Sequence, residues 1–320
     1  MLIVHFKHIK KYNYIQAIIF PKNTLIFLVG KILTFYGIFG IFLIVKTTWG
    51  AHSMRYVLDH DLHIHSGLST CSNDPEQNPE RILAYAKERG FKTICLTDHF
   101  WDSDVPCHST WYARQNYEHL CKAKPLPQDK IVEFLFGCET ELNSEFELAI
   151  TLEHFDNFDF VIIPTTHMHM KRHVVKEEDF ESVERRSQLW IDRFDAVLNM
   201  DLPFHKIGIA HLTCEYLGFP SFENFITALQ MIPDSEMERL FLKAAELGVG
   251  IELNGDDLAR AVNDPLIQLR PYRIAKQCGC KFYFGSDAHH PAGLTRNLDA
   301  MEKTIDLLRL EESDKFHIGR

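Results

Sequence analysis

The stretch Asp61 to Asp74, DLHIHSGLSTCSND, places two histidines one residue apart and follows them with a cysteine and a further acidic residue. On a β-strand, residues i and i+2 point to the same face of the sheet, so His63 and His65 would aim both imidazoles at one point. Imidazole and carboxylate are the ligands that zinc, manganese and iron use in catalytic sites. The pair indicates a metal site only if the rest of the chain supplies further ligands at equivalent places.

Side chains of the same chemistry recur along the chain, directly after short apolar runs. They are Asp98, His99, Glu139, His167, His169, His211, Asn254, Asp287 and His289. The C-terminal ends of parallel strands in a barrel meet at one face, where active sites are built. We therefore expect these side chains to converge on a metal centre. Because about nine candidate ligands exceed what one ion can use, we predict two to three divalent ions, either Zn, Mn or Fe.

Ions clustered in this way favour a particular reaction. They bind a phosphate group well and lower the pKa of a bound water, which gives hydroxide near neutral pH. The candidate ligands therefore favour hydrolysis of an anionic ester. Cationic side chains should bind the phosphate, and we expect Lys171, Arg172 and His173 to do so, although they could equally form a solvated loop; Arg185, Arg186 and Arg296 are weaker candidates. A long loop from Trp101 to Lys130 could cover the pocket.

The elements that must position these residues form a regular repeat from Met54 onward. Strand-like runs alternate with amphipathic helical stretches, which is typical of βα units and a largely parallel sheet. We predict strands at 56–62, 92–97, 131–137, 159–164, 206–210, 249–253 and 281–285. Asn78 and Gly90 would cap one helix, and a second would run from Ser235 to Gly248. Seven strands without a Ser/Gly-rich linker indicate one barrel domain over 54–320.

Composition narrows the class of protein. The 320 residues carry a formal net charge of −10, which argues against a surface that coats nucleic acid. The eight cysteines include no CxxC pair, and Cys95 and Cys138 sit in apolar runs. This pattern is typical of reduced, structural cysteines, so we predict a cytoplasmic protein, and nothing in the sequence implies a protein partner.

The first 53 residues differ from the rest of the chain. Residues 24–45 are apolar apart from Lys31 and are long enough to cross a bilayer, with several lysines before them. One interpretation is that residues 1–53 are upstream sequence joined by a wrongly assigned start and that the protein begins at Met54. The alternatives are a membrane anchor at 24–45, which would give the protein a membrane partner, or a buried helix.

The motifs DLHIHS, LTDH, GCE, a histidine after the fourth strand, AH and GSDAH, in this order, resemble the PHP (polymerase and histidinol phosphatase) domain family. The resemblance extends from Met54 to about Leu308. It implies an α/β fold, a distorted (β/α)7 TIM-like barrel with a trinuclear metal centre.

The resemblance also implies a ligand set. One ion would be held by His63, His65, Glu139 and Asp287, and Glu139 would bridge to a second ion held by His167 and His211. His99 and His289 would hold a third ion with a residue from STCSND. We prefer Asp74 to Cys71 there, because an oxygen ligand suits a hydrolytic centre better than a thiolate. Asp61 and Asp98 are expected to orient the imidazoles.

The activity that the resemblance implies is a metal-dependent phosphoesterase, similar to a histidinol phosphatase, that hydrolyses a small phosphorylated metabolite. Glu139 and Asp287 would be catalytic through the metals, and His169 would contact the substrate. The alternatives are a nuclease acting on DNA or oligonucleotides, another metal-dependent hydrolase similar to the amidohydrolases, and a non-enzymatic PHP domain. The acidic charge argues against the nuclease, and the retained ligands argue against the last.

Overall fold

The computed structural model describes residues 2–6, 14–20, 24–30, 43–48 and 54–319, except positions 73, 108, 181 and 264. The chain divides into two compact units, residues 1–54 and residues 55–320.

The N-terminal unit is a four-stranded antiparallel sheet in the order β1-β2-β3-β4. Its strands are β1 (Leu2–Phe6), β2 (Tyr14–Phe20), β3 (Thr24–Gly30) and β4 (Leu43–Thr48). Over 24–45, for which a membrane-crossing or buried helix was one expectation, the described residues are strand, and 31–42 lie outside the described residues. Among the described parts of the chain, no helix is both long enough and apolar enough to cross a membrane. The interpretation of residues 1–53 as untranslated sequence stays a prediction.

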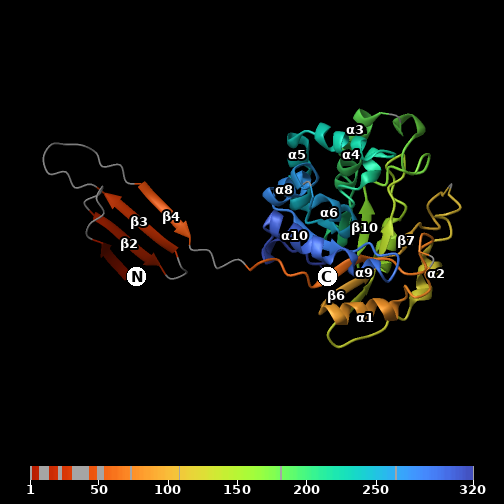
Figure 1. The fold of residues 1–320 in the computed structure, drawn as a ribbon, viewed down its shortest axis with the longest axis horizontal. Coiled ribbons are helices and arrows are strands. Elements are labelled where there is room, and N and C mark those ends of the chain that lie inside the picture. The colour runs from red at the N-terminus through yellow and green to blue at the C-terminus, as the bar shows by residue number, and fades with distance from the viewer. Residues whose placement is uncertain are drawn as a thin grey trace. The chain divides into compact units, whose positions relative to one another are not determined.

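The second unit is built on parallel strands that follow one another around a barrel (Figure 1). They are β5 (His60–Ile64), β6 (Thr93–Leu96) with its continuation β7 (His99–Phe100), β8 (Glu133–Phe136) with its continuation β9 (Cys138–Thr140), β10 (Val161–Pro164), β11 (Ile207–Ala210), β12 (Gly250–Asn254) and β13 (Lys281–Gly285). This order reproduces the seven predicted strands, with ends shifted by up to four residues.

Two interrupted strands divide the barrel into two sheets. Thr97 and Asp98 separate β6 from β7, and Gly137 separates β8 from β9. One sheet has the order β5-β6-β8, and the other has the order β13-β12-β11-β10-β9-β7. The edges at β5 and β13 meet, since the backbone N–H of Asp287 donates to the carbonyl of His63 at 2.8 Å and that of His65 to the carbonyl of Ala288 at 3.1 Å. The barrel is therefore distorted in two ways: two of its strands are interrupted, and its closure between β5 and β13 is irregular.

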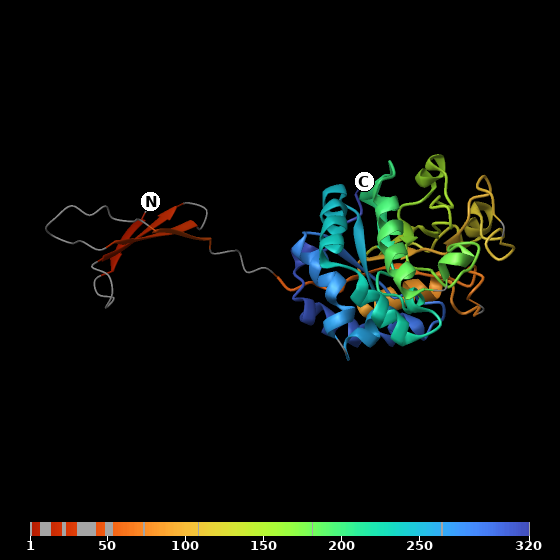
Figure 2. The same cartoon turned by 90° about the horizontal axis from the view of Figure 1, so that it is seen from above.

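Helices lie around the strands (Figure 2). The α-helices are α1 (Pro79–Arg89), α2 (Tyr117–Leu120), α3 (Val183–Leu198), α4 (Phe222–Met231), α5 (Asp234–Leu247), α6 (Gly255–Ala261), α7 (Pro265–Gln268), α8 (Arg270–Gln277), α9 (Gly293–Arg296) and α10 (Leu298–Leu308). The 3-10 helices are η1 (Cys121–Ala123), η2 (Leu152–Asn157), η3 (Glu177–Phe180), η4 (Phe204–Lys206), η5 (Glu215–Gly218) and η6 (Glu312–Asp314). As predicted, the Asn78 side chain accepts from the N–H of Arg81 to start α1, and Gly90, with φ +71°, ends it.

Apolar side chains fill the barrel and separate it from the helices. Along β6, Cys95 belongs to an inner cluster, whereas Ile94 and Leu96 belong to the larger cluster that includes the helix side chains. On β10, Ile162 belongs to the inner cluster, together with Phe160, which precedes the strand. The inner cluster blocks the barrel, so polar residues at the C-terminal ends of the strands lie above a packed floor.

Candidate metal centre

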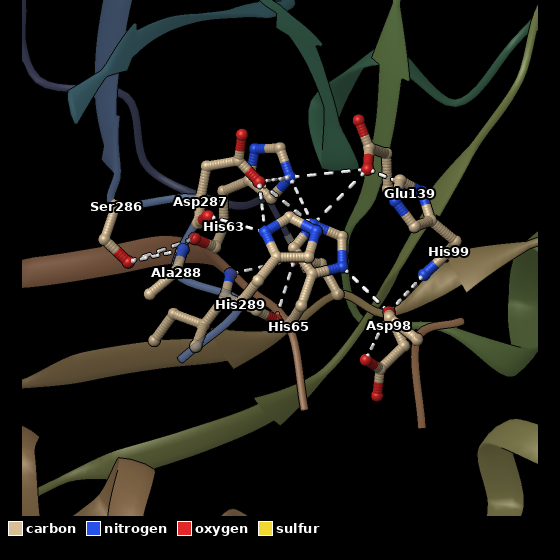
Figure 3. A network of polar contacts seen from close by, with 12 residues as sticks. His63, His65, Asp98, His99, Glu139, Ser286, Asp287, Ala288 and His289 are labelled. Atoms are coloured by element: carbon tan, nitrogen blue, oxygen red, sulfur yellow. Dashed lines mark hydrogen bonds and ion pairs between the residues drawn. The ribbon is translucent and has the colours of Figure 1, made fainter. Parts of the chain in front are cut away.

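The C-terminal ends of the barrel strands bring most of the predicted ligands together. His63 lies in β5 and His65 directly follows it, while Asp287 and His289 follow β13; Figure 3 shows their side chains pointing toward those of His99 and Glu139. His167 and His211, which follow β10 and β11, also face Glu139. His211 and Asp287 have φ values of +62° and +54°, in the left-handed region that is costly for residues other than glycine. Such strain is typical of functional sites.

Glu139 lies at the middle of the imidazoles, and its two oxygens face different groups. Oε2 lies 2.9 Å from Nδ1 of His99, 3.4 Å from Nε2 of His65 and 3.5 Å from Nε2 of His63. Oε1 lies 3.5 Å from Nε2 of His211 and 3.7 Å from Nε2 of His167. This carboxylate therefore stands between two sets of imidazoles, which is where a bridging ligand must stand.

Asp287 contacts three of the imidazoles that surround Glu139. Its Oδ1 lies 3.1 Å from Nε2 of His65 and 3.5 Å from Nε2 of His63. Its Oδ2 lies 3.6 Å from Nε2 of His211. The sets His63–His65–Asp287, His63–Glu139–His211 and His65–His99–His289 each have ligand atoms within 4.8 Å of one another.

The donor set fits divalent metal ions. Imidazole nitrogens and carboxylate oxygens converge at a buried place, and Oε1 of Glu139 is buried without a hydrogen-bond partner. A buried carboxylate oxygen with no partner is costly unless a cation or donor satisfies it. A metal ion between Glu139, His167 and His211 would do so.

Electrostatics keeps the two central carboxylates ionised. Burial alone would raise the pKa of Glu139, but the positive charges of His99 and His63 outweigh burial and hold that pKa well below its usual value. Burial is likewise outweighed at Asp287, whose pKa is held low chiefly by His63. Burial opposes a charge on His63, yet Glu252, Asp287 and Glu139 raise its pKa well above the usual value. Since a metal ligand must be a neutral imidazole, an ion bound by His63 would displace a proton.

Buried groups behind the imidazoles fix their orientation. Oε1 of Glu252 lies 2.5 Å from Nδ1 of His63, and Oε1 of Glu141 lies 2.8 Å from Nδ1 of His167. Asp257 lies 3.4 Å from Nδ1 of His211. The contacts with Glu252 and Glu141 hold the rings of His63 and His167 so that Nε2 of each faces the other candidate ligands. Glu252 and Asp257 were not predicted from the sequence, although an acid inside the apolar run VGIEL is a signal that could have identified Glu252.

The two acids that we expected to orient imidazoles act differently. Asp98 accepts from the Ser69 hydroxyl at 2.6 Å, and that hydroxyl lies 2.9 Å from Nδ1 of His65, so Asp98 acts through Ser69. Asp61 accepts from the backbone N–H groups of Ser286 and His63. Burial raises the pKa of Asp61 to about 7. Asp61 also accepts from the Tyr85 hydroxyl at 3.3 Å, so it ties backbone segments and a tyrosine together instead of orienting an imidazole.

The structure does not bring Asp74 to the centre. Its Oδ1 accepts from the N–H of Glu76 in a local turn, and its Oδ2 lies 3.9 Å from the ring of His290, at the surface. Cys71, at the surface, lines the same cavity as His99 and His289. Although burial opposes ionisation, these two histidines lower the pKa of the thiol to about 7. A tight turn from Ser69 to Ser72 places residue 71 at the cavity before the chain leaves this face.

A cavity of about 380 Å³ opens above the candidate ligands. Trp111 and Tyr112 line one part of it, so the loop after β7 forms a wall, as expected. Another part is lined by Glu215, Tyr216 and Asp256. His169 also lines the cavity, with its ring 3.9 Å from the ring of Tyr216. Burial lowers the pKa of His169 to about 4.

The cations predicted for phosphate binding lie elsewhere. Arg172 forms an ion pair with Glu177 at 2.9 Å and is largely exposed, and neither Lys171 nor His173 lines the cavity. The weaker candidates are also engaged: Arg185 pairs with Asp179, Arg186 donates to backbone carbonyls and Arg296 pairs with Asp256.

Within the described lining of the cavity, the arginine is Arg260, on α6, whose guanidinium pairs with Glu215. Arg260 was not predicted from the sequence, because it lies more than one helical turn beyond the end of β12.

Comparison with known proteins identifies the family. The PHP domain profile matches residues 61–230, which is more than half of the chain. The chain therefore belongs to the PHP domain family of metal-dependent phosphoesterases, as its motifs predicted.

Solved structures give a similar fold. A histidinol phosphate phosphatase from Lactococcus lactis subsp. lactis Il1403, complexed with zinc, L-histidinol and phosphate, is 17% identical, with a TM-score of 0.48 over 81% of this chain and 99% of that one. A candidate histidinol phosphatase from Listeria monocytogenes is 12% identical, with a TM-score of 0.52 over 75% of this chain and 98% of that one. The second likeness supports the distorted (β/α)7 barrel. The curated proteins include no significant match to this sequence.

Proposed function

We propose that the protein is a metal-dependent phosphomonoesterase that hydrolyses a small phosphorylated metabolite, in the manner of a histidinol phosphatase. The observation that carries this proposal is the position of Glu139, whose two oxygens face separate sets of imidazoles. Membership of a metal-dependent phosphoesterase family supports the same reaction class.

The residues divide into sets that fit two to three ions. His63, His65 and Asp287 would hold one ion, with Glu139 shared between it and a second ion bound by His167 and His211. His99 and His289 would contribute to a third. Bound divalent ions would act as Lewis acids toward the phosphoryl oxygens and lower the pKa of water to near neutrality.

The chain's own cavity residues would bind and orient the substrate. Arg260 would exchange part of its ion pair with Glu215 for the phosphate, because a guanidinium binds phosphate oxygens in a bidentate manner. His169 has an Nδ1 atom without a hydrogen-bond partner and lines the cavity, so it is placed to contact the ester. Trp111 and Tyr112 would exclude water from that side.

The size and charge of the cavity favour a small substrate over a nucleic acid. A volume of about 380 Å³ suits a metabolite. Glu215 and Asp256 on the wall would repel the successive phosphates of an oligonucleotide and would attract an amine at the far end of a metabolite. We therefore place a phosphorylated amine, such as histidinol phosphate, above a nuclease substrate.

The test is phosphate release by the full-length protein loaded with Mn²⁺ or Zn²⁺. A panel should contain phosphorylated metabolites with and without an amino group, together with single-stranded oligonucleotides. We expect turnover of phosphomonoesters, faster for those with an amine, and no release of nucleotides. Arg260→Ala should raise KM for the preferred ester more than it lowers kcat. Degradation of oligonucleotides in the absence of phosphomonoester turnover would refute the proposal.

A further inference from the structure

Arg193, on α3, is completely buried, and its guanidinium binds backbone carbonyls of separate segments of the chain. Nε donates to the carbonyl of Thr165 at 2.8 Å, and Nη2 donates to that of Leu142 at 2.8 Å. Nη1 donates to the carbonyls of Asn143, at 3.2 Å, and Val174, at 2.8 Å. One side chain therefore joins the segment after β9 to both ends of the loop that follows β10.

A cation in this position has an energetic cost. Burial lowers the pKa of Arg193 to about 10, and the charge of Glu141 opposes that shift. A buried charge is tolerated only where its donors are hydrogen-bonded or paired. Here four hydrogen bonds to backbone carbonyls satisfy most of the N–H donors of the guanidinium. The fork of donors, and not the charge alone, is thus what the surrounding backbone requires.

The bonded segments are those that surround His167. Glu141, whose Oε1 lies 2.8 Å from Nδ1 of His167, directly precedes one of the bonded carbonyls. Thr165 lies two residues before His167, and Val174 lies at the far end of the loop that carries His169. The guanidinium therefore holds both the backbone that carries the imidazole of His167 and the backbone that carries its orienting acid.

We propose that Arg193 is a positioning residue of the candidate metal centre, which holds the loop after β10 against the end of β9 and so keeps His167 directed at Glu139. The inference rests on the proposed function, in which His167 and His211 bind one ion. Lysine would keep the positive charge, but it lacks the planar fork and cannot donate toward all of the bonded segments at once. Arg193→Lys therefore separates the fork from the charge.

The first measurement is hydrogen exchange, followed by mass spectrometry, on the full-length protein. Arg193→Lys should exchange faster in peptides that cover 142–149 and 165–175, since local opening there would no longer break the guanidinium bonds. The matched control is Arg270→Lys. Arg270 also donates to two carbonyls, those of Leu229 and Ile232 at 2.6 Å each, but it does not line the cavity. Its effect should be confined to peptides around 229–232.

The second measurement is titration of the chelator-stripped, full-length protein with Mn²⁺ in a calorimeter. Arg193→Lys should weaken one equivalent of Mn²⁺ by about 10–100-fold, the range found when a group that orients a ligand is removed, and should leave the others unchanged. At limiting Mn²⁺ the kcat for a phosphomonoester should fall more than KM changes, and kcat should recover when Mn²⁺ is raised by the same factor. A role in packing alone would lower stability without this recovery.

The outcomes separate the inference from the proposed function. Arg193→Lys with wild-type exchange in both segments, or with wild-type affinity for every Mn²⁺ equivalent, would overturn the role of Arg193 and leave the phosphoesterase intact. A wild-type protein that binds Mn²⁺ but hydrolyses no phosphomonoester would overturn the proposed function, while faster exchange and one weakened equivalent in Arg193→Lys would still support the positioning role.

A second variant covers a failure to fold. If Arg193→Lys does not fold, Arg193→Gln, which keeps an N–H pair without the charge, is measured in its place with the same expectations. Failure of both variants to fold would assign Arg193 to the stability of the fold and overturn the inference.

Discussion

Glu139 is the residue on which the arrangement of the candidate centre most depends. The structure places its oxygens 2.9–3.7 Å from nitrogens of five histidines. A neutral amide of the same shape would keep the packing but lose the charge that attracts two ions. Glu139→Gln should therefore weaken both ions and reduce kcat by about 10²–10³-fold or more, the range found when one electrostatic group is removed from an active site. Metal content by elemental analysis and phosphate release measure the two effects.

Matched variants on the same strand sharpen this prediction. Glu133 begins β8 at the opposite end of the barrel, so Glu133→Gln should leave metal content and kcat unchanged. Glu141 contacts Nδ1 of His167 and the Tyr112 hydroxyl, so Glu141→Gln should give an intermediate loss through a misplaced imidazole. Equal and small losses in all three variants would refute the bridging position of Glu139.

Residue types at strand ends could be predicted from the sequence because parallel strands share one direction, so every strand ends on the same face. His63, Glu139 and Asp287 were predicted in this way, and the structure brings them together. The sequence offered both Asp74 and Cys71 but could not place either side chain, because their positions depend on a turn of four residues whose hydrogen bonds are not encoded in a periodic pattern. Arg260 could not be predicted for a related reason. It lies on a helix beyond the strand end, and only the tertiary fold brings that helix to the cavity.

Among the elements, the interrupted strand β8–β9 depends on Gly137. A Cβ atom there would overlap the carbonyl oxygen of Phe160 and lie 2.7 Å from Sγ of Cys95. Gly137→Ala should therefore overpack the barrel interior and lower the free energy of unfolding by about 1–3 kcal/mol. Chemical denaturation measures the change. Gly255→Ala, where the added carbon would meet its neighbours at 3.4–3.5 Å, is the control and should cost clearly less. Equal stabilities of the two variants would count against the close approach at Gly137.

The loop that follows β7, from Trp101 to Lys130, forms one wall of the cavity. An ion pair with a defined pH dependence holds this loop to η2. Nδ1 of His154 lies 2.6 Å from Oδ2 of Asp102, and this contact raises the pKa of His154 above the ordinary 6.5. The stabilisation is therefore complete below about pH 6.5 and is lost as the pH rises through the higher pKa of the folded state. At the acid end, burial of Asp102 is outweighed by hydrogen bonds, which lower its pKa below 3.8, so the pair persists until the pH falls through that lower value.

The measurement is chemical denaturation of wild type and His154→Gln at pH 6 and pH 9. We expect the wild type to be more stable than His154→Gln at pH 6. This difference in the free energy of unfolding should be smaller at pH 9. His173→Gln, in another loop, should show no such trend. A difference that grows toward pH 9 would contradict the assignment.

The sequence predicted the seven strands in order but not the division of two of them. The apolar runs KTICLT and IVEFLFG contain β6 and β8, and the continuations β7 and β9 lie just beyond them. Periodicity did not reveal these continuations, because it reports burial and not the pairing partner. The interruption is set by tertiary packing: β6 and β8 pair with each other in one sheet, whereas β7 and β9 pair in the other. No local pattern in either run encodes that change of partner.

For the molecule as a whole, metal removal should reduce stability. Ions that bind the folded centre and not the unfolded chain stabilise by about 2.7 kcal/mol each when they are present 100-fold above Kd. Stripping with a chelator should therefore lower Tm by roughly 5–10 °C per ion. Elemental analysis should find two to three Zn, Mn or Fe ions per chain before stripping. An unchanged Tm, with no transition metal bound at the start, would contradict the prediction.

The N-terminal unit marks where sequence reasoning was weakest. An apolar run of the length of a membrane span predicts a helix only if the chain keeps one conformation throughout. The described residues of that run instead pair as antiparallel strands, β2 with β3 and β3 with β4. β-branched and aromatic residues dominate β3, and such residues favour strands as readily as apolar helices. That translation starts at Met54 remains a prediction.

The candidate ligands and the cavity walls come from different parts of the fold, and this separation bears on how the enzyme could diverge. The candidate ligands come mostly from the rims of the parallel strands, whereas the cavity walls come from the segment around Trp111, from η5 and from α6. Loop segments tolerate substitution and changes of length that strands do not. Descendants of this gene could therefore acquire a new substrate by altering Trp111, Glu215 or Arg260 while inheriting the metal centre unchanged. Relatives that share the motifs of this chain are then expected to agree in reaction and to differ in the molecule on which they act.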